Sequence, residues 1–151
     1  MSTTATQAQA AIRSQIEAGS IAFPLYWQGE DAPILPDDPT TFAFIIFNNE
    51  GSGRSPIAYG GGRGANLYRN NATVEAYVFA PNGEGLAVAA DAAETIAAQL
   101  RSFRSGDVSC FSADVIPVGP GSSISPPGFS SEVSNYQCAV AEIALHFDQI
   151  G

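Results

Sequence analysis

The stretch that most restricts the fold of this chain runs from Val78 to Phe103 and reads VFAPNGEGLAVAADAAETIAAQLRSF. It begins as an apolar strand, turns at Pro81–Gly85 and continues as an alanine-rich segment with apolar residues at helical spacing. Because alanine is small, the backbone of such a helix can lie close against a sheet, with Leu100 and Phe103 anchoring its far end. We expect a helix that packs on a sheet and is ended by Gly106.

The glycine turn inside this stretch is a poor candidate for a phosphate site. A strand, a glycine turn and a helix in this order can hold a phosphate on the amides of the helix N-terminus. A Walker-type loop also needs a lysine, and this chain contains none. Glu84, between Gly83 and Gly85, would place a repelling carboxylate where the phosphate should lie. The turn is therefore predicted to start the helix, and no cofactor is expected.

Apolar periodicity predicts one further helix and five strands. Besides the central helix, the predicted elements are a helix over 3–18 and strands from Phe23 and over 41–47, 72–80, 108–118 and 137–147. The strand TFAFIIF, Thr41–Phe47, is continuously apolar, which predicts burial on both faces or at an interface. The last two strands are expected to pair antiparallel. The order αβββαββ predicts one α+β domain over residues 1–151, with an antiparallel or mixed sheet and helices packed on one face.

The charge of the chain argues against nucleic acid and membranes as partners. It has 6 basic and 15 acidic residues, a net charge of −9 and a pI near 4.2. Polyanions would be repelled, so we expect no measurable affinity for double-stranded DNA at physiological salt. Arg63 and Arg69 lie among glycines and tyrosines, as in RNA-binding tails, but two arginines are too few in so acidic a chain.

No run of apolar residues approaches the about 18 residues of a membrane span. The start of the chain also lacks the basic and apolar parts of a signal peptide, so synthesis in the cytosol is expected.

The polar residues do not form a recognisable catalytic set. His146, the sole histidine, shares one face of a predicted strand with Cys138 and Glu142. Residues four apart on a strand are about 13 Å apart, so these side chains cannot converge. We expect an edge or interface histidine and no enzyme activity.

Metal and disulfide sites are not expected either. An acidic cluster near the start lacks the regular spacing of a calcium loop, which favours a solvated turn. Its members are Glu30, Asp31, Asp37 and Asp38. Cys110 and Cys138 lack metal-ligand spacing, so they are predicted to be reduced, partly buried thiols.

Two long loops are predicted from their glycine, asparagine, proline and serine content. Asn48–Asn71 is interpreted as two turns around a short strand at Ile57–Tyr59. Gly119–Tyr136 has little to bury, and a loop of this length inside a compact domain usually has a function or a partner.

The order and spacing of several segments carry a family resemblance. From Thr41 onward they are a buried strand, a glycine-containing loop, an arginine just before the next strand (Arg69), a strand ending in VFAPNGEG, the helix AADAAETIAAQL and a late apolar strand after a variable loop. With the helix over 3–18 they cover nearly the whole chain, which resembles the tail terminator, or tail-completion, proteins of long-tailed phages and gene transfer agents. Related proteins often have a glycine after the arginine, where this chain has Asn70-Asn71-Ala72. Asparagine also tolerates positive φ, so a turn is expected there.

This resemblance implies a non-enzymatic ring, commonly hexameric, that caps the head-proximal end of the tail tube. The ring would end polymerisation of the tube and offer a joining surface to the head. The implied partners are further copies of the chain, the tail tube protein and head-tail connector proteins, in the neck of the virion. DNA would pass through without specific binding. The expected assembly contacts are Arg63, Arg69, Ser125, Pro126, Pro127 and Phe129. Arg63 is expected to be exposed, because it lies in a glycine-rich loop without periodic apolar neighbours.

Two other classes of function stay open. A small-ligand or nucleotide-handling enzyme would need a pocket with convergent polar groups. The other class is a monomeric module that binds a host protein, which a molecular mass measured alone and with tail tube protein would distinguish from a ring.

Overall fold

The computed structural model describes residues 2–30, 35–51, 56–58, 60, 62–121, 124 and 133–151. Within them the chain forms two helices and six strands. In chain order these are α1 (Ala5–Ala18), β1 (Leu25–Trp27), β2 (Phe42–Gly51), β3 (Leu67–Pro81), α2 (Leu86–Leu100), β4 (Arg104–Ser105), β5 (Val108–Pro120) and β6 (Tyr136–Ile150). The predicted α+β class is confirmed, and the predicted order αβββαββ lacks only the two-residue strand β4.

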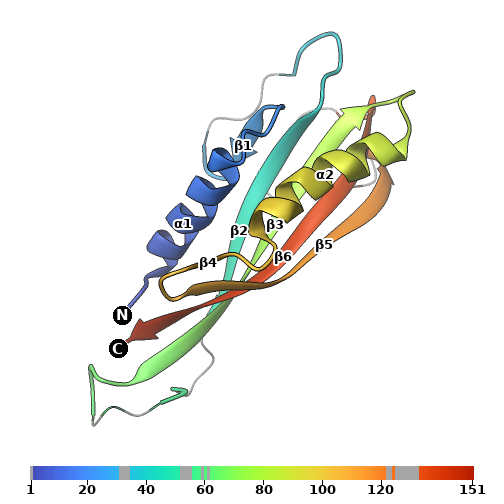
Figure 1. Cartoon of the computed structure of the whole chain (residues 1–151). Coiled ribbons are helices and arrows are strands. Elements are labelled where there is room, and N and C mark those ends of the chain that lie inside the picture. Colours follow the sequence, from blue (N-terminus) through green and yellow to red (C-terminus); the bar gives the residue numbers. More distant parts are fainter. Residues whose placement is uncertain are drawn as a thin grey trace.

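The strands form one mixed sheet in the order β1-β2-β3-β6-β5-β4 (Figure 1). β1 runs parallel to β2, and all the other neighbours are antiparallel, β5 and β6 included. At the centre, β3 and β6 are each 15 residues long and pair from Leu67↔Ile150 to Pro81↔Tyr136. The edge strands are short, since β1 has three residues and β4 has two.

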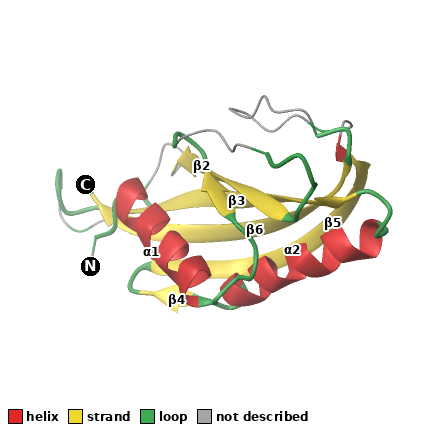
Figure 2. Cartoon of the chain, turned by 90° about the horizontal axis from the view of Figure 1, so that it is seen from above, coloured by secondary structure: helices red, strands yellow, loops and turns green. Residues whose placement is uncertain are grey.

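Both helices cover the same face of the sheet (Figure 2). Side chains alternate between the two faces along a strand, and the residues that β3 and β6 contribute to the core beneath the helices are small or aliphatic apart from Phe147. Against them α2 buries Ala89, Ala93 and Ala97 completely, and Leu100 is buried at its end. The alanines therefore bring the helix backbone close to the sheet, as predicted.

The N-terminal helix begins with a capping box. The side-chain oxygen of Thr4 accepts a hydrogen bond from the backbone N–H of Gln7 at 3.2 Å, and the Gln7 side chain accepts one from the N–H of Thr4 at 2.9 Å. These bonds satisfy N–H groups that have no partner within the helix. The helix ends before Gly19, as predicted.

The end of α2 differs from the prediction. The helix stops at Leu100 and not at Gly106, because Arg101 takes an extended conformation with ψ of 118° and Ser102 then takes a left-handed one with φ of 59°. The Phe103 carbonyl then accepts a hydrogen bond from the N–H of Cys110 at 2.9 Å, which draws the chain into the β4–β5 hairpin. Gly106, with φ of 57°, lies in the turn of that hairpin. Phe103 is consequently half-buried at the margin of the core.

The start of β3 also differs from the prediction. The strand begins at Leu67, so Arg69 lies inside it and Asn70-Asn71-Ala72 pair with β6 instead of forming a turn. The reason is the length of β6, which continues to Ile150 and supplies partners for these residues. Tertiary pairing overrides the local preference of asparagine for turns.

We predict that Leu100→Ala lowers the free energy of unfolding by about 2–5 kcal/mol, because it leaves a cavity at a fully buried site. Phe103→Ala should cost less than the roughly 3–5 kcal/mol of a fully buried phenylalanine, because Phe103 is half-buried. Urea unfolding of both variants measures the difference. A greater loss in Phe103→Ala than in Leu100→Ala would contradict the assignment.

Candidate functional site

We call the face of the sheet opposite α1 and α2 the helix-free face (Figure 2). At one end it carries an aromatic cluster, in which the rings of Phe42 and Phe79 stack with centroids 5.0 Å apart. The ring of Tyr136 meets Phe42 edge-on at 5.3 Å. Phe44 and Ile46 are buried on this face too, while Ala43 and Ile45 of the same strand are buried beneath the helices. The predicted burial of this strand on both faces is confirmed.

A row of carboxylates crosses the middle of the helix-free face. Glu75 of β3 lies opposite Glu142 of β6, which lies opposite Asp114 of β5. We call these three residues the acidic row. Like charges directly opposite one another on neighbouring strands are destabilising. None of the ion pairs among the described residues involves the acidic row.

Hydrogen bonds within the face partly satisfy two members of the acidic row. The Tyr77 hydroxyl donates to Glu75 at 2.5 Å, and the Ser112 hydroxyl donates to Asp114 at 2.9 Å. Burial and the bond to Glu75 raise the pKa of Tyr77, so its hydroxyl keeps its proton at neutral pH. Neither neutral donor cancels the negative charge of the row.

Two large apolar side chains on β5 are exposed beside the acidic row. Ile116 is 48% exposed and lies opposite Val140, one step along the helix-free face from Asp114. Phe111, 64% exposed, lies where a β-bulge shifts the register between Cys110 and Ser112. Its ring stacks on His146 with centroids 5.8 Å apart. A bulge can re-aim a side chain, and here the residue at the bulge is the exposed phenylalanine.

Arg63 is exposed, as predicted, in the loop between β2 and β3. It is flanked by Gly62 and Gly64, which have positive φ values of 132° and 84°. A side chain added at either glycine would meet no described atom within 4 Å. Arg63 makes no ion pair within the described residues. Its role as an assembly contact remains a prediction.

Arg69 is already engaged within the chain. Its Nε and Nη2 atoms donate to the two carboxylate oxygens of Asp148 at 2.8 and 2.9 Å. The two residues are register partners on β3 and β6, so the pair ties the ends of these strands together. The hydrogen bond from Arg69 lowers the pKa of Asp148. The guanidinium is 43% exposed, and its role as a contact is a prediction that stands untested.

The other expected contacts, Ser125, Pro126, Pro127 and Phe129, lie outside the described residues. They belong to the predicted loop Gly119–Tyr136, of which the structure describes mainly the two ends. There β5 continues to Pro120, and β6 begins at Tyr136.

The side chains considered for catalysis or for a disulfide do not come together in the structure. Cys138, Glu142 and His146 follow one another along the helix-free face of β6, as predicted, and do not converge. Cys110 lies in the core beneath the helices and Cys138 in the aromatic cluster, so the two free thiols are on opposite faces of the sheet. Burial raises the pKa of Cys110 to about 11 and that of Cys138 to about 12.

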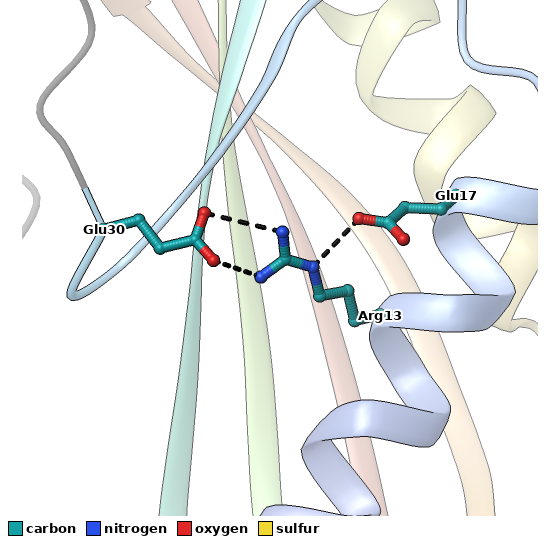
Figure 3. Close-up of polar contacts among 3 residues, drawn as sticks. All are labelled: Arg13, Glu17 and Glu30. Carbon is teal, nitrogen blue, oxygen red and sulfur yellow. Dashed lines mark hydrogen bonds and ion pairs between the residues drawn. The ribbon is translucent and has the colours of Figure 1, made fainter.

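One member of the predicted acidic turn, Glu30, forms an ion pair within the chain. Arg13 of α1 bridges Glu17 and Glu30 (Figure 3). Its guanidinium also lies 4.7 Å from the centre of the Trp27 ring. Asp37 and Asp38 are exposed, and Asp31 is outside the described residues. In the part of the chain that the structure describes, no three His, Cys, Asp or Glu side chains are grouped to hold a metal ion.

Sequence reasoning missed the acidic row and the exposure of Phe111. Strand alternation placed Glu142 on the less apolar face of its strand, but which residues lie opposite it depends on register. The β-bulge at Phe111, which exposes its side chain, could not be predicted from the residues around it.

No protein-family model and no curated protein matches this sequence. Solved structures do match, and one of them covers 92% of this chain and 94% of its own at 16% identity, with a TM-score of 0.49. At that similarity the likeness carries no inference about function. None of the helices in the described parts is long and apolar enough to cross a membrane.

Titration of His146, the sole histidine, tests its placement on the helix-free face. Burial lowers the pKa of His146, and the positive charges of Arg69 and Arg104 lower it further, although Asp148 acts in the opposite direction. NMR titration should therefore give a midpoint below the ordinary value of 6.5, and Arg104→Ala should raise that midpoint. The folded state favours the neutral ring of His146 over the charged one. The contribution of His146 to stability is therefore full above pH 6.5 and is lost as the pH falls through the lowered pKa. A midpoint above 6.5 would contradict the placement.

The pair between Arg69 and Asp148 predicts a loss of stability in acid. The lowered pKa of Asp148 means that its contribution is full above the ordinary value of 3.8 and disappears as the pH falls through the folded-state pKa. Asp148→Asn should reduce the free energy of unfolding at pH 7 by up to about 1 kcal/mol, the scale of a partly exposed pair, and by less in acid. The control is Asp91→Asn, since Asp91 is exposed and makes none of the described ion pairs. Equal losses at both pH values in Asp148→Asn would count against an electrostatic origin.

Proposed function

We propose that this chain is a structural virion protein of the tail terminator kind. Copies of it assemble into a ring on the head-proximal end of a tail tube, end the polymerisation of the tube and offer a surface to the head-tail connector proteins. The tail tube and the head are named as partners on the basis of the family resemblance in the order of elements. The α+β fold, with its strand, glycine turn and alanine-rich helix, is compatible with this resemblance.

The observation that carries the proposal is the helix-free face. It exposes Phe111 and Ile116 beside three carboxylates placed directly opposite one another. In an isolated molecule this arrangement costs stability through repulsion and exposed apolar area. A protein partner that covers the apolar side chains and supplies a cation relieves the repulsion and buries the apolar area, and both effects favour binding. Such a surface supports an assembly function.

The charge of the chain fits passage of DNA without binding. Each copy has a net charge of −9, so a closed ring carries a large net negative charge. DNA in its channel would be repelled and would remain mobile. We place the assembled protein in the neck of the virion after synthesis in the host cytoplasm.

Tail assembly with and without the protein tests this function. With the protein present, electron microscopy should show tails of uniform length joined to heads. In its absence, tails should be overlong or headless, because nothing ends the polymerisation of the tube. Normal, head-joined tails in the complete absence of the protein would refute the terminator function.

A further inference from the structure

The β2–β3 loop and the helix-free face carry complementary groups. The loop presents Arg63, which has no carboxylate partner among the described residues, together with Ile57, which is 53% exposed. The helix-free face presents the acidic row, which makes none of the described ion pairs, together with Phe111 and Ile116. Each surface therefore combines an exposed apolar side chain with unpaired charge, and the two charges are opposite in sign.

These two surfaces lie too far apart to meet within one molecule. The loop extends beyond the end of β3 that begins at Leu67 (Figure 1). Glu75 lies eight positions further along the same strand, and at about 3.3 Å per residue this separation is roughly 26 Å. A contact between Arg63 and the acidic row must therefore join two copies of the chain.

We propose that the β2–β3 loop of one copy docks on the helix-free face of the next copy, with Arg63 bound to the acidic row. Ile57 of the same loop then packs beside Phe111 and Ile116. This inference rests on the proposed function, because a ring supplies the neighbouring copy. It goes beyond that function by naming the two surfaces that meet.

The chemistry of Arg63 suits this position. A guanidinium presents several N–H donors in a planar fork, so it can bind carboxylates on adjacent strands at once. Gly62 and Gly64 have no side chains to hold the loop away from a flat sheet. Apolar side chains around the charges exclude water, which strengthens the attraction. The contact joins two different surfaces, so copies repeat head to tail and can close into a ring.

The other described arginines do not offer the same combination. Arg13, Arg69 and Arg101 are each paired with a carboxylate of their own chain. Arg104 makes none of the described ion pairs, but it is in register with Ser109 and His146 and so belongs to the helix-free face itself. Arg63 is the arginine in the described residues that is both unpaired and remote from the acidic row.

Cysteine cross-linking tests the contact without removing either charge. Ala65→Cys places a thiol beside Arg63, and Ala144→Cys places one beside Glu142 on the helix-free face. The natural thiols contribute little background, because Cys110 and Cys138 are buried and their pKa values are raised to about 11 and about 12. Chains with Ala65→Cys are mixed with chains carrying Ala144→Cys, as purified protein and in assembled tails, and oxidised mildly. The mixed disulfide is read on a non-reducing gel.

The matched control is Ala87→Cys, which places a thiol on the exposed outer surface of α2. We expect the Ala65→Cys chain to cross-link at least tenfold faster with Ala144→Cys than with Ala87→Cys. Adding Arg63→Glu to the Ala65→Cys chain should abolish this preference. Adding Glu142→Arg to the partner chain should then restore it, because the two charges have been exchanged.

Equal rates with Ala144→Cys and Ala87→Cys, or no effect of Arg63→Glu, would overturn the docking proposal and leave the terminator function standing. Normal tails in the absence of the protein would instead remove the terminator function. Preferential cross-linking of the purified protein in that case would still establish the loop-to-face contact. The two experiments therefore separate the two proposals.

Discussion

The antiparallel ladder between β3 and β6 is the interaction on which the other parts of the structure depend. It lies at the centre of the sheet, so every other strand is positioned directly or indirectly by its register. α2 packs over it, and the acidic row crosses it on the opposite face. The start of the chain is fastened to its end, because the Thr3 N–H donates to the Asp148 carbonyl at 2.9 Å. The N- and C-termini consequently lie side by side (Figure 1).

The two faces of this ladder have different compositions because they meet different neighbours. Toward the helices, β3 offers alanine and valine from Ala72 to Ala80, which leave room for the backbone of α2 and fill the core. On the opposite face, β3 passes from Phe79 through Tyr77 to Glu75, from an aromatic cluster to a charged and accessible zone. Stability thus comes mainly from one face and from the aromatic end of the other. The accessible zone is the one on which we propose that a partner binds.

Much of the fold could be predicted from the sequence because the strongest patterns are local. Alternation in β6 placed Cys138, Glu142 and His146 on one face of the strand, and helical spacing predicted the buried face of α2. The predicted end of α2 was wrong because Arg101 leaves the helical conformation and Ser102 takes a left-handed one that glycine would be expected to take. The turn expected at Asn70-Asn71-Ala72 was wrong because β6 offers these residues a distant partner.

The candidate site was less predictable, because it depends on strand pairing between distant parts of the sequence and not on local patterns. Glu75 and Asp114 are far apart in the sequence and become neighbours of Glu142 only through strand register. The exposure of Arg63 was predicted correctly from its glycine neighbours, since that signal is local. Residue type and spacing therefore located one side of the proposed contact, whereas the other side required the three-dimensional pairing of strands.

The short edge strands bear on how copies of this protein can associate. A long bare edge would accept a strand from another molecule and could extend into a fibre. Beyond β4, the edge of β5 is obstructed, because Arg101 donates to the Ala113 carbonyl at 3.1 Å and Pro117 has no N–H to offer. Copies are thus steered away from endless sheet extension and toward association through faces and loops. For a protein proposed to stop the growth of another polymer, resistance to becoming a polymer itself is a useful property.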